Sequence, residues 1–205
     1  MVTGRPGEGP MRAGAAICDI AAGLYAALGV LTALHERQTS GEGQWVQSSL
    51  LHAGLGLLDF QAARYTVNQE IPRQVGNDHP TGMPTSSYRT KDGYINIGAS
   101  GDGMWGRLCK VIGREDLHKK PEYIDGKARS KNRQALNEDL DRTLVTKPSA
   151  EWIEAINKAG VPCGPIYTMD QVFADPQVRH MGMAESVAHP VRGEVKLIAQ
   201  ATKLS

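Results

Sequence analysis

Asp19 is the residue of this 205-residue sequence whose setting is best suited to chemistry. It is the one charged residue in a long run of small and apolar residues, Ala13–Leu34. An unpaired buried charge is strongly disfavoured, so a carboxylate in such a run calls for a reason. Near a helix N-terminus, free N–H groups and the macrodipole favour the ionised form. A dry, ionised carboxylate on a rigid helix is a candidate nucleophile for covalent catalysis.

Two structural roles compete with this one. The Asp19 carboxylate would equally serve as a helix cap or as the ion-pair partner of an arginine such as Arg12. The neighbouring Cys18 is a nucleophile by type, but a thiol in an apolar helix is usually inert core. From the residues alone, the capping, ion-pair and nucleophile roles of Asp19 all stay open.

Other familiar catalytic and cofactor patterns are absent from the sequence. It holds no GxGxxG after a strand, no P-loop, no HExxH and no GxSxG. The six histidines show no ligand spacing, so we expect no metal site. Three separated cysteines without a CxxC pair indicate reduced thiols and a cytoplasmic location. A net charge of +1 offers no footprint for nucleic acid or an anionic membrane.

The run that contains Asp19 is predicted to be one helix that is packed on every side. Alanine and glycine cover most of its faces, and it is long enough to raise a transmembrane alternative. Asp19 and the many small residues favour packing inside a protein instead. Large apolar residues recur every three or four positions, which is a helical stripe, at Ile17, Ile20, Leu24, Leu28, Leu31 and Leu34.

The rest of the sequence predicts short helices and strands around a proline- and glycine-rich segment, 67–84, which is a linker or a functional loop. A β-hairpin is expected over 86–98, with Asp92-Gly93 as its turn. A second pair of strands is expected around Arg192-Gly193. Residues 119–129 are charged and irregular. Further helices are expected over 50–66, 101–112, 132–144, 149–159 and 170–173.

Several segments, taken together, resemble the class III coenzyme A transferases of the CaiB/BaiF family. The segment Pro10–Gly23 is similar to the active-site segment of that family. The likeness runs in order along nearly the whole chain, and an ordered set is more specific than one motif. The other matching segments are Ala33–Arg37, Ser40–Gln44, Gly76-Asn77, His79-Pro80, Tyr88–Gly93, Ala159–Pro165, Asp175–Gln177 and His189-Pro190.

The resemblance implies that Asp19 occupies the position of the family's nucleophilic aspartate. It implies transfer of coenzyme A between an acyl-CoA and a small carboxylic acid, through an aspartyl anhydride and an aspartyl-CoA thioester. Coenzyme A then enters as a substrate thioester, and no covalently bound cofactor is expected. In the racemase branch of the family the matching aspartate acts as an acid/base on an α-methylacyl-CoA, so that reaction stays an alternative.

The family also has a glycine-rich loop that closes over the bound intermediate. Gly82 lies at the matching place and is the candidate for contact with the substrate. This chain has one glycine there instead of a run. The lid role of Gly82 is therefore implied by one matching residue, whereas the role of Asp19 is implied by a matching segment.

The fold implied is α/β, with a split large domain of helices and a partial Rossmann-like region, and a smaller α+β domain. We expect residues 1–66 to form large-domain helices with the active-site segment, 67–165 the small domain, and 166–205 a return to the large domain. Members of the family are roughly twice as long, so the chain resembles their C-terminal half and looks truncated. Most contacts to coenzyme A would lie in the absent half.

The implied partners follow from that truncation. We expect an interlocked homodimer, or pairing with the missing N-terminal half, and neither a nucleic acid nor a membrane as a partner. A half-chain would expose its buried helices unless a partner covered them. A second hypothesis is therefore a non-catalytic remnant that acts only by association with a homologous chain.

Overall fold

The computed structural model describes residues 2–204, and their contacts divide the chain into two units, Met1–Pro80 and Thr81–Ser205. Helices hold 48% of the residues and strands 12%, which confirms the mixed α/β composition. The division into three parts at residues 66 and 165 stays a prediction.

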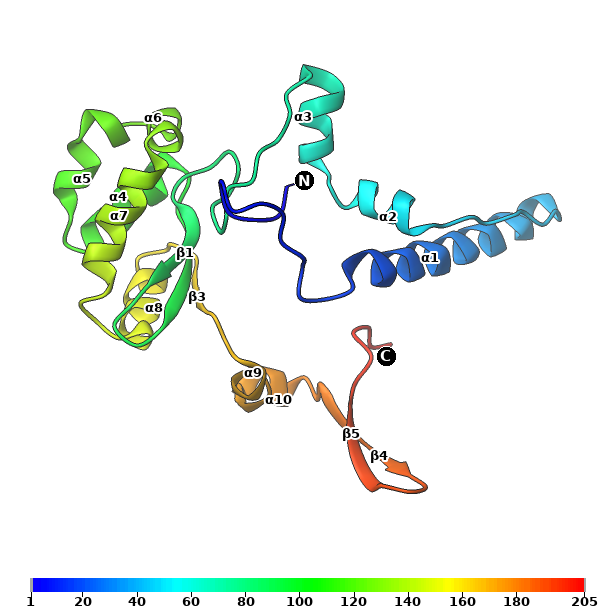
Figure 1. The fold of residues 1–205 in the computed structure, drawn as a ribbon. Helices are drawn as coiled ribbons and strands as arrows, with labels where there is room; N and C mark the ends of the chain where they lie inside the picture. Colours follow the sequence, from blue (N-terminus) through cyan, green and yellow to red (C-terminus); the bar gives the residue numbers. More distant parts are fainter. Residues whose placement is uncertain (1, 205) are drawn as a thin grey trace. The chain divides into compact units, whose positions relative to one another are not determined.

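The first unit is built around one long helix, α1 (Ile17–Ser40) (Figure 1). It ends at Gly41, which adopts a left-handed φ of 74° and donates its N–H to the carbonyl of Arg37 at 2.8 Å. The chain then returns along α1. Ser48 Oγ donates to the Ala22 carbonyl at 3.0 Å, and Gln44 Nε2 donates to Glu36 Oε2 at 2.7 Å.

Two short helices stand where the sequence predicted one over 50–66. They are α2 (Leu50–Gly56) and α3 (Phe60–Asn68). The break lies at Leu57–Asp59, where Asp59 adopts a positive φ of 45°. Aspartate is among the few non-glycine residues that tolerate this region, and glycines in the preceding helix weaken its continuation.

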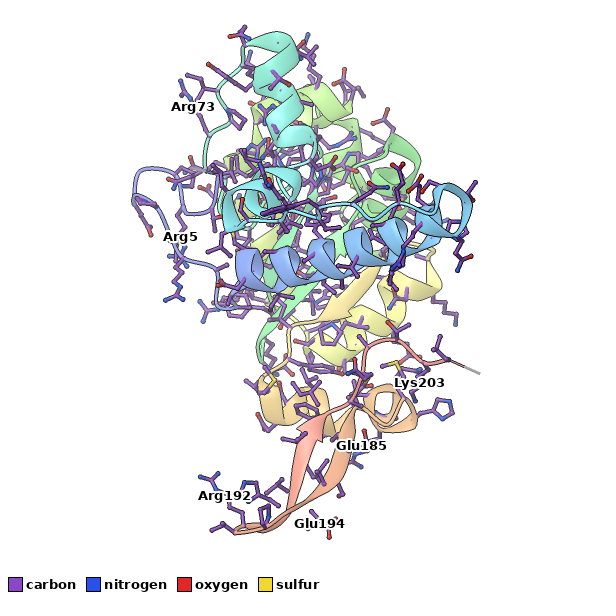
Figure 2. All side chains as sticks on the ribbon, turned by 90° about the vertical axis from the view of Figure 1, so that its right-hand side faces the viewer. Arg5, Arg73, Glu185, Arg192, Glu194 and Lys203 are labelled. Atoms are coloured by element: carbon purple, nitrogen blue, oxygen red, sulfur yellow. The ribbon has the colours of Figure 1, made fainter. Side chains whose placement is uncertain are left out.

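The N-terminal loop and the segment after α3 are held together by backbone contacts. The N–H of Gly76 donates to the Gly4 carbonyl at 2.9 Å, and Gln74 Nε2 donates to the Thr3 carbonyl at 2.9 Å. A Cβ on Gly4 would lie 2.5 Å from Gln74 Nε2, and its φ is +140°, so the position demands glycine. Figure 2 shows Arg5 and Arg73 extending from these two stretches.

The second unit begins with an antiparallel sheet of three strands in the order β1-β2-β3. The strands are β1 (Thr85–Arg89), β2 (Tyr94–Gly98) and β3 (Cys163–Pro165). Tyr88 pairs with Ile95, and both are buried because alternate residues face the core. The predicted hairpin around Asp92-Gly93 is confirmed.

Helices complete the core of this unit. Trp105, Leu108, Leu136, Leu140 and Ile156 lie in one buried cluster with the inward side chains of the sheet. The predicted irregular stretch, 119–129, contains a 3-10 turn and the start of a helix. In order the elements are α4 (Asp102–Val111), α5 (Glu115–Lys119), η1 (Pro121–Tyr123), α6 (Gly126–Lys131), α7 (Arg133–Leu144) and α8 (Ser149–Lys158).

The last part of the chain carries two short helices and a hairpin. The helices are α9 (Met169–Ala174) and α10 (Pro176–His180), and the hairpin joins β4 (Ala184–His189) to β5 (Gly193–Ile198). Arg192 and Glu194 lie at its turn (Figure 2). Nearly every residue of this hairpin is exposed, although an isolated two-stranded hairpin is only marginally stable in water.

Asp92 connects the turn of the first hairpin to the start of α8. Its Oδ1 accepts hydrogen bonds from the Ser149 N–H and the Ser149 hydroxyl, both at 2.8 Å, and from Thr90 Oγ1 at 3.2 Å. The bond from the Ser149 backbone contributes most to holding the pKa of the Asp92 carboxyl below its ordinary value of 3.8. The carboxylate thus satisfies a free N–H at a helix start.

Replacing Asp92 by alanine is therefore expected to destabilise this unit at neutral pH. Because the pKa is lower in the folded state, the stabilisation is fully present above the unfolded pKa and is lost as the pH falls through the folded pKa. Urea midpoints of wild type and Asp92→Ala should differ near pH 7 and converge in acid. Glu154→Gln, on an exposed carboxylate of α8, is the control. A gap between Asp92→Ala and wild type that widens in acid would contradict this account.

Candidate active site

Asp19 lies in the first turn of α1, and its side chain is exposed. The N-cap of the helix is Ala16, and no side chain caps it. Among residues 2–204, none forms a hydrogen bond or an ion pair with the Asp19 carboxylate, Arg12 included. Neither competing role is therefore seen in the described chain, and the carboxylate stands at the positive end of the helix macrodipole.

The expectation of a helix packed on every side is wrong for this chain. Ala21 is the one buried residue of α1, and Leu24, Leu28 and Leu31 are 67%, 61% and 64% exposed. The physical reason is that α2 and the returning segment cover only part of the helix. The large apolar residues on one side of the helix are exposed. We call them the α1 stripe and define it as Ile17, Ile20, Leu24, Leu28, Leu31 and Leu34.

The α1 helix also satisfies a length and hydropathy criterion for a membrane span, with a mean hydropathy of 1.9. The same criterion is met by core helices of soluble proteins. It is the single such helix among the described residues, and it carries Asp19 in its first turn.

The three thiols differ in their surroundings. Burial raises the pKa of Cys109 to about 12 and that of Cys163 to about 11, so both are protonated at neutral pH. Cys18 is exposed and adjoins Asp19. Within the described part of the chain, no group of three histidine, cysteine or acidic side chains could hold a metal ion.

Gly82 lies in the half-buried stretch that enters β1, which we call the Gly82 segment and define as Thr81–Pro84. Met83 and Pro84 are buried, and the N–H of Ala99 donates to the Pro84 carbonyl at 2.7 Å. Because Asp19 belongs to the first unit and Gly82 to the second, their meeting in one site stays a prediction.

Arg129 was missed by sequence reasoning. It is fully buried on α6, although arginine is seldom buried without partners. Its Nε donates to the Met83 carbonyl at 2.8 Å, and its Nη2 donates to Asp102 Oδ1 at 2.6 Å. The local sequence, with charged residues on both sides, reads as an exposed loop, so it offers no signal for this contact.

The whole chain is similar to known proteins of one family. A sequence model of CoA-transferase family III matches residues 1–205. The human succinyl-CoA:glutarate CoA-transferase is 31% identical over 204 residues, which are 100% of this chain and 47% of that protein. The succinyl-CoA–D-citramalate CoA-transferase of Chloroflexus aurantiacus is 33% identical over 206 residues, 100% of this chain and 51% of its own.

Solved structures agree with these sequence matches. A CAIB/BAIF family protein from Brucella suis superposes with a TM-score of 0.75 at 32% identity, covering 99% of this chain and 56% of that one. A Mycobacterium tuberculosis protein in an orthorhombic crystal form gives a TM-score of 0.83 at 25% identity, covering 100% and 53%. The chain thus spans about half the length of the curated relatives it matches.

Proposed function

The chain belongs to CoA-transferase family III, and on that premise we propose that it contributes the nucleophile for transfer of coenzyme A between an acyl-CoA and a carboxylic acid. Asp19 is that nucleophile. The observation that carries the proposal is its position in the first turn of α1, unneutralised by any described side chain, inside the segment that resembles the family's active site.

The chemistry begins with attack of the Asp19 carboxylate on the thioester carbonyl, which forms a mixed anhydride and releases the CoA thiolate. The thiolate then attacks the aspartyl carbonyl, which releases the donor acid and leaves an aspartyl-CoA thioester. The acceptor carboxylate attacks this thioester, and the thiolate released finally attacks the acceptor's acyl carbonyl. Product acyl-CoA leaves, and Asp19 is again a carboxylate. Dividing one difficult exchange in this way lowers each barrier.

The substrates are proposed from the relatives. Those named above are transferases of succinyl-CoA with glutarate or D-citramalate, and the Acetobacter aceti relative uses acetyl-CoA and oxalate. A short acyl-CoA and a small dicarboxylic acid are therefore the first pair to test. The racemase alternative rests on the resemblance alone. We place the reaction in the cytoplasm.

A partner that covers the α1 stripe is part of the proposal. Exposed apolar patches of this kind mark protein interfaces. The partner is a second copy in an interlocked homodimer or a chain that supplies the N-terminal half, with Gly82 near the bound substrate. A partner on the α1 stripe would also exclude water from Asp19, and a desolvated carboxylate is the better nucleophile.

The remnant hypothesis is favoured by one observation, the exposure of the α1 stripe in a chain that spans half of its relatives. Hydroxylamine trapping separates the two functions, because hydroxylamine captures activated carboxyl groups. The chain is incubated with succinyl-CoA and hydroxylamine, and its intact mass is measured. A hydroxamate on the protein supports Asp19 as nucleophile. No adduct on a chain that circular dichroism shows to be folded would leave the remnant hypothesis.

The exposed stripe also predicts association. The wild-type chain is expected to self-associate with rising concentration in sedimentation velocity, because burial of each leucine contributes about 1.5–3 kcal/mol. The double variant Leu24→Glu/Leu31→Glu should shift the distribution toward monomer. Val191→Glu, at an exposed position beside the turn of the last hairpin, is the control and should change nothing. Equal association of all three chains would remove the stripe as the interface.

A further inference from the structure

We infer that Arg129 is a positioning residue for the Gly82 segment: its guanidinium fixes the backbone beside Gly82 to the core of the second unit. This inference rests on the proposed function, in which the Gly82 segment meets the substrate.

The guanidinium binds three separate stretches of backbone. Besides the Met83 carbonyl, it donates from Nη1 to the Tyr123 carbonyl at 3.2 Å and from Nη2 to the Ser100 carbonyl at 2.9 Å. These carbonyls belong to the Gly82 segment, to η1 and to the turn before α4. A planar fork of donors can satisfy several acceptors at once, as a lysine ammonium cannot with the same geometry.

The positive charge of Arg129 is balanced by a carboxylate at one edge of its guanidinium group. Asp102 accepts from Nη2 at 2.6 Å and is 68% exposed, so one carboxylate at the surface neutralises a fully buried cation. The ring of Trp105 lies 5.7 Å from the guanidinium carbon and adds a cation–π contact. With these partners the cation is paired and hydrogen-bonded, which a buried charge requires.

The neighbouring residue of α6 holds the same segment. Ser130 Oγ donates to the Thr81 carbonyl at 3.3 Å. The carbonyls on both sides of Gly82 are therefore bound by consecutive residues of one helix. The third anchor is the Ala99 N–H on the Pro84 carbonyl. The backbone is thus fixed on both sides of Gly82, and preorganisation of this kind is what a catalytic site needs from its supporting residues.

Hydrogen exchange followed by mass spectrometry tests the inference on the chain itself, without substrate. In Arg129→Lys we expect the amides of residues 81–83 to exchange about tenfold faster, since about one net hydrogen bond is lost there. Ser130→Ala should give a smaller rise in the same amides. Trp152→Phe is the matched control, because it removes a buried hydrogen bond to the Leu144 carbonyl elsewhere in the core.

The outcomes separate positioning from stability. If Arg129 only stabilises the fold, Arg129→Lys would raise amide exchange across the whole unit. Exchange at residues 81–83 would then change no more than in Trp152→Phe. That result would overturn the inference. Local exchange at 81–83 with an inactive wild type in the hydroxylamine assay would leave Arg129 as a positioning residue and remove the proposed function. If the wild type is active in the hydroxylamine assay and exchange at residues 81–83 is unchanged in Arg129→Lys, the proposed function stands and Arg129 is not a positioning residue.

Discussion

Asp19→Asn is expected to abolish hydroxamate formation on the chain, lowering the trapping rate at least about 10³-fold. Asparagine keeps the size and polarity of the side chain but has no carboxylate to attack a thioester. Loss of a covalent nucleophile removes the whole covalent route and not one contact within it. The measurement is intact mass with time, at a fixed concentration of succinyl-CoA and hydroxylamine, followed by peptide mapping of the modified residue.

Two further variants make this test specific. Glu36→Gln changes another exposed carboxylate of α1 and should trap at the wild-type rate. Cys18→Ser removes the adjacent thiol, which would itself form a thioester if it were the nucleophile. Wild-type trapping in Cys18→Ser together with its loss in Asp19→Asn assigns the chemistry to the carboxylate. A hydroxamate that persists in Asp19→Asn would end the proposal for Asp19, whereas an acyl thioester on Cys18 would lose its acyl group to hydroxylamine and leave no hydroxamate on the protein.

Arg129→Met is expected to cost about 3–5 kcal/mol of the free energy of unfolding of the second unit. Methionine fills part of the volume but donates no hydrogen bond. The carbonyls of Met83, Tyr123 and Ser100 would lose a donor, and burying such groups unpaired is the main penalty. Asp102 is largely exposed, so the abandoned carboxylate adds little. Urea unfolding monitored by tryptophan fluorescence measures the effect.

Arg142→Met is the matched control for this change. Arg142 Nη2 donates to Asp139 Oδ1 at 2.6 Å, but its side chain is 68% exposed. Asp139 is itself buried, but it keeps its bonds from Lys120 Nζ and Tyr123 Oη when Arg142 is removed, so we expect a loss of only about 1 kcal/mol. Equal losses in the two variants would show that burial of the Arg129 guanidinium adds nothing to stability, contrary to the contacts described.

Local patterns predicted much of the fold. The Asp92-Gly93 turn with alternating residues on either side identified the first hairpin, and the sequence around Arg192-Gly193 identified the last. Residues 132–144 and 149–159 correspond to α7 and α8 within one residue. These elements are set by contacts between residues close in sequence, and period and turn chemistry report such contacts directly.

The misses have a different physical origin. Residue type favours burial of the α1 stripe, but burial needs another surface. The resemblance to a family of twice the length, and not the helix itself, predicted that the stripe would be exposed in this chain. Arg129 is the converse case: an arginine among charged residues predicts exposure, and its carbonyl partners lie up to 46 residues away. Contacts at that separation depend on tertiary packing, which a single sequence does not display.

The three thiols differ in burial, which allows one of them to be labelled selectively. Cys109 and Cys163 are held protonated by burial, while Cys18 is exposed one residue before the candidate nucleophile. A maleimide dye at neutral pH should therefore attach at Cys18 alone, without any engineered cysteine. The emission wavelength and anisotropy of such a dye would report on the surroundings of Asp19. Binding of a partner chain at this end of α1 could then be followed in real time.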